Sequence, residues 1–156
     1  MAQKSRLTSI LSGIAGEYFV AAELSRRGYV ASLTLRNTRG MDILASNIDA
    51  TRSVGIQVKT NQGRGRAWML NQKAEKDTAE NLFYVFIRLN DLAEPQCHIV
   101  PRAVVAKYIR RSHKAWSSTR GRRGQRHKDT TIRKFPDKND KYLNRWDLLG
   151  LGDSAL

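Results

Sequence analysis

Three short strand patterns follow one helical pattern in the first sixty residues, with only brief turns between them. Apolar residues recur at helical spacing across residues 7–28, and residues 30–35, 42–46 and 54–60 then read as strands. Connections this short usually leave consecutive strands as neighbours in one sheet. We therefore expect a sheet against which the first helix packs.

The second half of the chain adds further strands and another helix. Residues 67–70, 82–89 and 98–100 are strand candidates. Pro101 suits the first turn of a helix, and apolar residues follow it at helical spacing up to residue 116. The order of helix, strand cluster and helix predicts an α/β protein with a mixed central β-sheet flanked by helices.

The C-terminal forty residues differ in composition from the rest of the chain. Residues 117–134 lose all periodicity and are rich in Ser, Gly and basic residues, which predicts a basic, flexible loop that extends to about residue 140. We expect an α/β core over residues 1–116, this loop over residues 117–140, and a C-terminal helix and tail over residues 141–156 that packs Trp146 and Leu149 on the core.

The charge of the chain indicates a polyanionic partner. The 156 residues include 28 Lys or Arg and 14 Asp or Glu, which gives a net charge of +14 at pH 7. The longest strongly apolar run, residues 82–87, is too short to cross a membrane. The N-terminus lacks a plausible cleavage region, so we expect a cytoplasmic protein. Cys97 is the single cysteine and is expected in the core, which leaves neither an internal disulfide nor a cysteine-based zinc site.

Four polar residues in the first sixty positions are candidates for a common site. Asp42 stands where a turn enters a strand, and the period of two places Gln57 and Lys59 on one face of the next strand. If the two strands pair, these side chains converge, and Glu17 can add a carboxylate from the first helix. Each residue could instead have a purely structural role. Asp42 could form a turn, Gln57 and Lys59 could lie on a solvated strand face, and Glu17 could lie at the edge of the apolar stripe of its helix.

The chemistry of these four residues suits phosphodiester hydrolysis. Oxygen atoms of Glu17, Asp42 and Gln57 are of the type that binds a hard divalent cation. Such a cation polarises a phosphate and lowers the pKa of a bound water, and the Lys59 ammonium would stabilise the negative charge that develops.

The same residues resemble the active-site signature of the PD-(D/E)XK nuclease superfamily. Glu17 follows Gly16 in the helix, Gly40 precedes Asp42, and Gln57, Val58 and Lys59 stand in the place of the last motif. The pattern is most similar to small Holliday-junction-resolvase-like, Mrr-type and intron-homing endonucleases, some of which carry Gln in this motif. Two departures are Met41, where the family often has Pro, and Gln57, where it often has an acidic residue.

The resemblance implies a restriction-endonuclease-like core, with helix and three strands followed by more strands and a helix. It implies a metal-dependent DNA endonuclease with Glu17, Asp42, Gln57 and Lys59 as catalytic residues and the first three as metal ligands. It also implies Mg²⁺ as the cofactor, with Mn²⁺ as a substitute, and suggests a homodimer. Because Gln57 is neutral, the alternative is an inactive nuclease-like domain that binds DNA or RNA without cutting.

The nucleic acid is expected to lie along the basic part of the chain. Residues 102–134 contain twelve Lys or Arg and a single acidic residue, Asp129. Such a segment positions double-stranded or branched DNA through its phosphates without reading its sequence. The residues that we expect to contact phosphates are Arg64, Arg66, Arg110, Arg111, Lys114, Arg120, Arg122, Arg123 and Arg126. Charge alone would also suit a ribosome-associated or membrane-surface protein.

Overall fold

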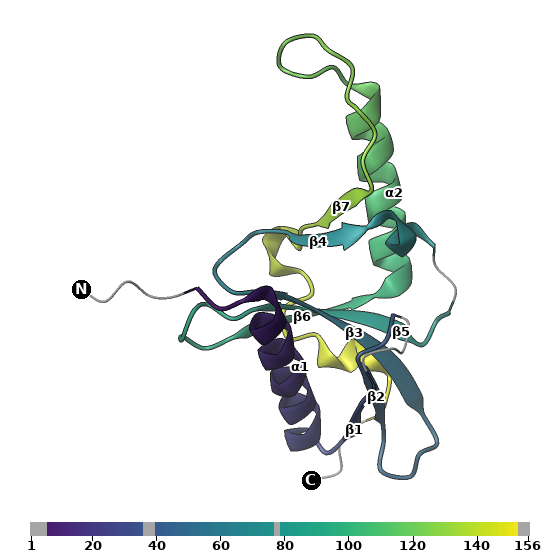
Figure 1. Ribbon diagram of the computed structural model, residues 1–156. Coiled ribbons are helices and arrows are strands. Elements are labelled where there is room, and N and C mark those ends of the chain that lie inside the picture. The colour runs from purple at the N-terminus through teal and green to yellow at the C-terminus, as the bar shows by residue number, and fades with distance from the viewer. Residues whose placement is uncertain (1–5, 36–39, 77–78, 153–156) are drawn as a thin grey trace, which may run out of the picture.

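The computed structural model describes residues 6–35, 40–76 and 79–152, and it has a five-stranded central sheet with a helix on each side (Figure 1). The strand order is β1-β2-β3-β5-β6. The elements of this layer and its first helix are α1 (Ser9–Arg26), β1 (Val30–Leu33), β2 (Ile43–Ser46), β3 (Ser53–Asn61), β5 (Leu82–Arg88) and β6 (Gln96–Pro101).

The central sheet is mixed, as the sequence predicted. β1 pairs with β2, and β2 with β3, in antiparallel fashion, whereas β3 and β5 run parallel and β6 returns antiparallel to β5. Antiparallel neighbours need only a turn, but a parallel pair needs a longer crossover. The chain between β3 and β5 forms this crossover and contains β4 (Trp68–Asn71) and the 3₁₀ helix η1 (Gln72–Glu75). The predicted α/β class, a mixed sheet flanked by helices, is confirmed.

Helix α1 forms where the apolar spacing predicted it. Thr8 caps its N-terminus by accepting a hydrogen bond from the backbone N–H of Leu11, 3.2 Å long. Val20 and Leu24 are fully buried against the sheet. Gly28 has a φ of 83°, a left-handed conformation that favours glycine and lets the chain turn into β1.

The strand alternation divides the core between the two faces of the sheet. Ile56, Val85 and Ile99 belong to the cluster on the α1 side, which also contains Trp146 and Leu149. On the opposite face, the central sheet packs against α2 (Arg102–Ser118), β4 and β7 (Ile132–Phe135). The buried residues of this second cluster are Trp68, Leu70, Ala74, Tyr84, Phe86, Val100, Val105, Ile109 and Phe135. α2 extends two residues beyond the predicted end at residue 116.

A two-stranded sheet formed by β4 and β7 was not predicted. The strand candidate 67–70 is a strand, but it pairs with β7 and not with the central sheet, and β7 lies within the segment that was expected to be a loop. The sequence of residues 132–135 does not alternate between apolar and polar residues, because the buried position 133 holds an arginine that forms an ion pair with Glu75. A paired arginine therefore takes a position where the pattern requires an apolar residue.

The C-terminal segment returns to the core through two 3₁₀ helices, η2 (Lys138–Asp140) and η3 (Trp146–Leu149). The predicted helix is thus shorter than expected and is a 3₁₀ helix, but Trp146 and Leu149 are buried as expected. Residues 36–39, between β1 and β2, and the tail after residue 152 lie outside the described residues.

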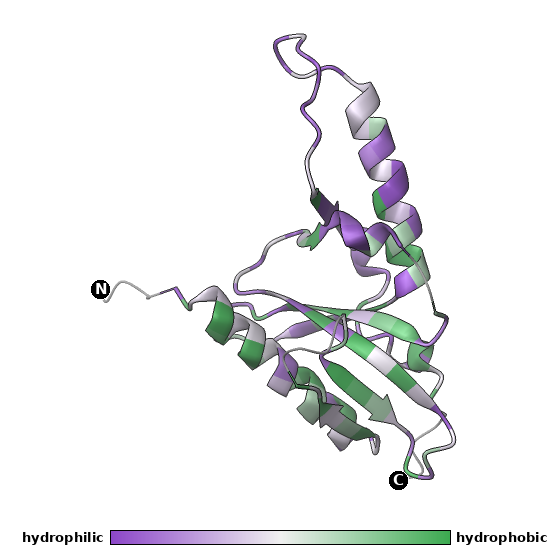
Figure 2. Cartoon of the chain, turned by 45° about the vertical axis from the view of Figure 1, so that its right-hand side comes forward, coloured by the Kyte–Doolittle hydropathy of each residue, from purple (hydrophilic) through white to green (hydrophobic). Residues whose placement is uncertain are grey.

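Residues 110–131, which we call the arm, project from the rest of the molecule (Figure 1). The arm consists of the second part of α2 and the loop that follows, in which Arg120 and Arg126 form an isolated β-bridge. The strands of the central sheet and α1 contain many hydrophobic residues, whereas hydrophilic residues predominate along the arm (Figure 2).

Candidate functional site

Asp42 lies at the point where β2 separates from β3. Its backbone N–H donates to the carbonyl of Ile56, 2.8 Å, and its Oδ2 atom accepts a hydrogen bond from the backbone N–H of Val58, 2.7 Å. The carboxylate therefore takes the place of a backbone carbonyl at the end of the β2–β3 ladder. This hydrogen bond uses one of its two oxygen atoms, and the side chain is half-buried.

Gln57 and Lys59 lie on the same face of β3, as the period of two predicted. Ile43 is the last residue of β2 that pairs with β3, opposite Ile56, and the carboxylate of Asp42 just before it binds the backbone of Val58, which lies between Gln57 and Lys59. On the other side of β3, Gln57 pairs with Tyr84 and Lys59 with Phe86. Tyr84 and Phe86 belong to the α2 side of the core, so Gln57 and Lys59 face that side, where both are half-buried. The Asp42 carboxylate therefore lies beside the part of β3 that carries Gln57 and Lys59.

Glu17 comes from the layer on the other side of the sheet. Helix α1 packs on the face that carries Ile56, Val58 and Thr60, and Gly16 lies directly against the Thr60 side chain. The half-buried Glu17 follows Gly16, so it lies beside the C-terminal half of β3, where Lys59 is the neighbour of Thr60. Glu17 therefore belongs to the layer opposite the face that carries Gln57 and Lys59.

The structure adds a cation that sequence reasoning did not assign to the site. Arg102, the first residue of α2, places its guanidinium carbon 5.5 Å from the centre of the Tyr84 ring. The guanidinium also packs on Gly40, where an added Cβ would lie 3.2 Å from one of its terminal nitrogens. Its Nε atom is buried, and no partner for it is found among the described residues. Arg102 therefore lies beside the turn that leads to Asp42.

The pKa of Tyr84 reports the electrostatics of this region. Burial raises the pKa of its phenol above the ordinary value, the Arg102 guanidinium lowers it, and the negative charge of Asp42 raises it. Tyr84 pairs with Gln57 in the sheet, and the charges of both Arg102 and Asp42 act on its phenol. Only the path of the chain through β5, β6 and α2 brings Arg102 to Tyr84, sixty residues after Asp42.

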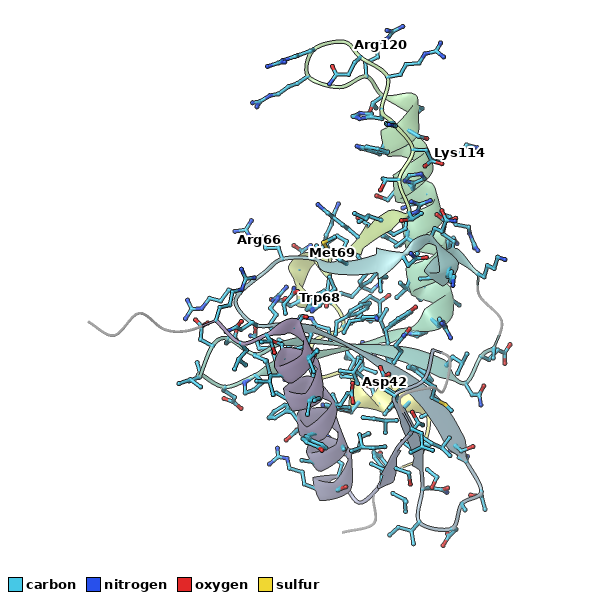
Figure 3. All side chains as sticks on the ribbon, in the orientation of Figure 1. Asp42, Arg66, Trp68, Met69, Lys114 and Arg120 are labelled. Carbon is cyan, nitrogen blue, oxygen red and sulfur yellow. The ribbon has the colours of Figure 1, made fainter. Side chains whose placement is uncertain are left out.

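The residues expected to bind nucleic acid lie in two separate places. Arg64 and Arg66 are exposed in the loop between β3 and β4, whereas Arg110, Arg111, Lys114, Arg120, Arg122, Arg123 and Arg126 are exposed on the arm. Figure 3 shows Arg120 near the outer end of the arm, Lys114 further down α2, Arg66 beside β4, and Asp42 on the central sheet. A nucleic acid that contacted both the arm and Asp42 would therefore have to span a large part of the molecule.

The basic side chains of the arm have few anionic neighbours. Among the described residues, no ion pair involves a Lys or Arg of the arm, and Arg120 donates to the carbonyl of Gly124, 3.0 Å, within the loop. Their charges are therefore available to phosphates with little disruption of existing interactions.

A group of potential metal ligands lies apart from the predicted set. Ligand atoms of His98, Asp137 and Asp140 lie within 4.8 Å of one another. Nδ1 of His98 is hydrogen-bonded to Asp137, 2.7 Å, and the backbone N–H of Tyr142 donates to the same carboxylate, 2.8 Å. Asp140 forms an ion pair with Arg88, 3.2 Å. The group thus joins the C-terminal segment to β6 and β5, which gives it a structural role that the sequence did not reveal.

None of the described helices combines the length and the apolar character that crossing a membrane requires.

Comparison with known proteins finds similarity in three-dimensional structure. No family model and no curated protein matches the chain. Among solved structures, the chain is similar to Hjc, a Holliday junction resolvase from the archaeal hyperthermophile Archaeoglobus fulgidus. The two chains are 14% identical, with a TM-score of 0.46, over 80% of this chain and 84% of that chain.

Proposed function

We propose that the protein is a metal-dependent DNA endonuclease that hydrolyses phosphodiester bonds at Asp42, Gln57 and Lys59, with Glu17 as a further ligand from α1. One observation carries the proposal. The Asp42 carboxylate lies where β2 leaves β3 and accepts a hydrogen bond from the backbone of Val58, the residue between Gln57 and Lys59. A carboxylate, an amide and an ammonium on neighbouring strands are the groups that phosphodiester hydrolysis requires.

The donor atoms of this site suit a hard divalent cation. The second oxygen of Asp42 and the amide oxygen of Gln57 are ligands that Mg²⁺ accepts. Glu17 would restore the negative charge that a neutral Gln57 lacks by reaching round the edge of β3 from the α1 layer. Mn²⁺ would substitute for Mg²⁺ at oxygen ligands of this kind. When bound, such a cation polarises the phosphate and lowers the pKa of a water molecule.

The cationic side chains would act on the phosphate itself. The half-buried Lys59 ammonium would stabilise the charge that develops on the phosphate oxygens as the bond breaks. Arg102 is held against Tyr84 and Gly40, so its guanidinium is preorganised to orient a phosphate that enters beside Asp42. Lys59 would thus act on the charge that develops during the reaction, and Arg102 on the orientation of the phosphate.

The arm would supply affinity. Its Lys and Arg side chains suit the phosphates of double-stranded or branched DNA. Cutting both strands requires two sites, so we propose that the active form is a homodimer.

A second candidate is a domain that binds DNA or RNA without cutting it. It is favoured by Gln57, which contributes no charge, and by the structural hydrogen bond of Asp42, which occupies one carboxylate oxygen. In this case the arm would carry the whole function, and metal ions would have no effect on the nucleic acid.

The test is cleavage of supercoiled plasmid and of a branched-junction oligonucleotide in Mg²⁺ or Mn²⁺, with wild type beside Lys59→Ala. We expect metal-dependent nicking that Lys59→Ala abolishes, with unchanged Tm and DNA affinity. Lys73→Ala removes an exposed lysine of η1 and serves as the matched control, with wild-type cleavage expected. Cleavage retained by Lys59→Ala would remove the role given to Lys59. Tight, salt-sensitive binding without cleavage by the wild type would favour the binding domain.

A further inference from the structure

A groove of about 430 Å³ lies where α2 meets β4 and β7, at the base of the arm. Its walls are the arm face of α2, with Ile109, His113 and Trp116, and the segment that ends in β7, with Ile132 and Lys134. Met69 of β4 contributes to the same surface. None of Asp42, Gln57, Lys59 and Arg102 lines this groove, so it is separate from the candidate site described above.

The groove exposes large apolar side chains that the strand alternation leaves outside. Trp68, Leu70 and Phe135 point into the core, so Met69 and Ile132 point outwards, with 57% and 46% of their surface exposed. Trp116 is 37% exposed, whereas Trp68 and Trp146 are buried. Apolar side chains that gather in a hollow favour a ligand that removes them from water.

The Trp116 ring already accepts a planar heteroaromatic ring on its surface. The imidazole of His127 stacks on it with 4.2 Å between ring centres and 28° between planes, and His113 lies at 5.4 Å. His127 belongs to the loop of the arm, where its ring nitrogen lies 3.5 Å from the hydroxyl of Thr119. A hydrogen bond this long is weak, so an incoming ring can replace His127 with little loss of stability.

The charges around the groove select among possible occupants. Of its charged lining residues, Arg133 is buried and paired with Glu75, whereas Lys134 is exposed and cationic. Lys114 and Arg120 lie further along the arm and add positive charge (Figure 3). Asp129 is the single acidic residue of the arm and is engaged by His113, 3.1 Å. An apolar peptide would satisfy the groove but not this charge. A nucleotide offers a flat ring for the groove and a phosphate for the cations.

We propose that this groove binds an unpaired base of a nucleic acid whose flanking phosphates lie on the arm. The inference rests on the nucleic-acid binding in the proposed function and makes it more specific, because a base within an uninterrupted duplex cannot enter the groove. The arm then favours single-stranded, bulged or branched substrates over continuous duplex. Stacking on Trp116 supplies this preference without reading the base sequence, since every base has a flat face.

The test measures binding in EDTA, so that cleavage plays no part. The probes are a labelled oligothymidylate, a duplex of the same length, and that duplex with a single-stranded bulge. Trp116→Ala is expected to weaken binding of the oligothymidylate and the bulge roughly tenfold and binding of the duplex less than about twofold. Tyr18→Ala removes an aromatic side chain of α1 that is 61% exposed and is the matched control, with no change expected.

Two further measurements distinguish a loss of binding from a folding defect in Trp116→Ala. Met69→Ser alters the other side of the groove without touching Trp116 and is expected to give the same selective loss of affinity. Oligothymidylate is expected to quench the tryptophan emission of the wild type, and Trp116→Phe to abolish that quenching, because the other two tryptophans are buried. Circular dichroism and Tm of each variant show whether the fold is retained.

Three outcomes would overturn the inference. These are an equal loss of affinity for all three probes, no loss for any probe, and concentration-dependent self-association that Met69→Ser removes. The last would identify the groove as an interface between copies of this chain. If instead the wild type cuts no substrate when metal is added, the endonuclease proposal fails while the selective binding result stands, so the two failures are distinguishable.

Discussion

The Oδ2 atom of Asp42 accepts a hydrogen bond of 2.7 Å from the backbone N–H of Val58, across the point where β2 leaves β3. This carboxylate therefore completes the sheet ladder and also carries the negative charge of the candidate site. An amide can replace a carboxylate as a hydrogen-bond acceptor but not as an anion. Substitutions at this position therefore separate the structural role from the chemical one.

We predict that Asp42→Asn keeps the fold and loses the chemistry. The amide oxygen still accepts from Val58, so the free energy of unfolding should change by less than about 0.5 kcal/mol, whereas Asp42→Ala should cost about 1 to 3 kcal/mol because a half-buried N–H loses its partner. Urea denaturation measures the change in stability. Mn²⁺ titration calorimetry and plasmid cleavage measure the loss of metal binding and of activity. Asp49→Asn, in the exposed turn between β2 and β3, is the control. Wild-type metal binding by Asp42→Asn would contradict the role given to this residue.

Two glycines of α1 are predicted to respond to alanine in opposite directions. A Cβ on Gly13 meets no heavy atom within 4 Å, so Gly13→Ala should stabilise the protein by about 0.5 to 1 kcal/mol through the higher helix propensity of alanine. A Cβ on Gly16 would overlap the Thr60 side chain, so Gly16→Ala should destabilise by about 1 to 3 kcal/mol.

The double variant Gly16→Ala, Thr60→Ala tests the cause of that destabilisation. It removes the atoms that the new methyl group meets, so part of the free energy of unfolding should return, as measured by urea denaturation. No recovery in the double variant would show that the close approach of α1 to β3 is not what requires glycine.

The parts of the fold that the sequence predicted are those where local pattern and tertiary environment agree. The stripe of α1 and the alternation of Ile56, Gln57 and Val58 follow from burying one face of a helix or strand, and both were predicted. The pairing of β2 with β3 could be expected because a short turn joins the two strands.

The parts that could not be predicted depend on interactions between distant segments. β4 and β7 are sixty residues apart, and β7 places the charged Arg133 at a buried position because Glu75 neutralises it. Arg102 reaches Tyr84 and Gly40 only because β5, β6 and α2 follow one another across the sheet. No local pattern encodes either interaction.

The stability of the protein is predicted to fall as the pH drops below about 6.5, through His98. Burial lowers the pKa of its imidazole, and the hydrogen bond to Asp137 offsets only part of this effect. In the unfolded chain His98 takes up a proton near its ordinary pKa of about 6.5, while in the folded protein it remains neutral to lower pH. Over that window the unfolded state binds more protons, so acid favours unfolding by up to about 1.4 kcal/mol for each pH unit.

The variant His98→Asn isolates this contribution, because asparagine keeps an N–H donor for Asp137 and does not titrate. Urea denaturation at a series of pH values from about 7.5 to 5 is the measurement, with wild type and variant side by side. The variant should lose less stability than the wild type as the pH falls. Parallel curves for the two proteins would show that His98 takes no part in the acid sensitivity.

Cys97 is predicted to be unreactive in the native protein. It is 2% exposed, and burial raises the pKa of its thiol to about 12, so almost no thiolate is present at pH 8. A chromogenic disulfide reagent should therefore react with Cys97 only in denaturant, where one thiol per chain should appear. Fast reaction of the native protein at pH 8 would show that β6 opens far more readily than its packing indicates.

The position of the arginines on the arm, and not their number, is predicted to determine nucleic-acid affinity. Replacing Arg120, Arg122, Arg123 and Arg126 with serine should lower affinity for duplex and unpaired probes alike, and should reduce the slope of log affinity against log salt by about one for each phosphate that is no longer neutralised. The fold should persist because these side chains are exposed. The hydrogen bond that Arg120 donates to Gly124 is lost, but it joins two residues of the same loop. The control removes the same charge from exposed positions outside the arm, Lys73, Lys76, Lys138 and Lys141. An equal fall in affinity for both variants would mean that affinity follows net charge alone, and the arm would then have no special place in binding.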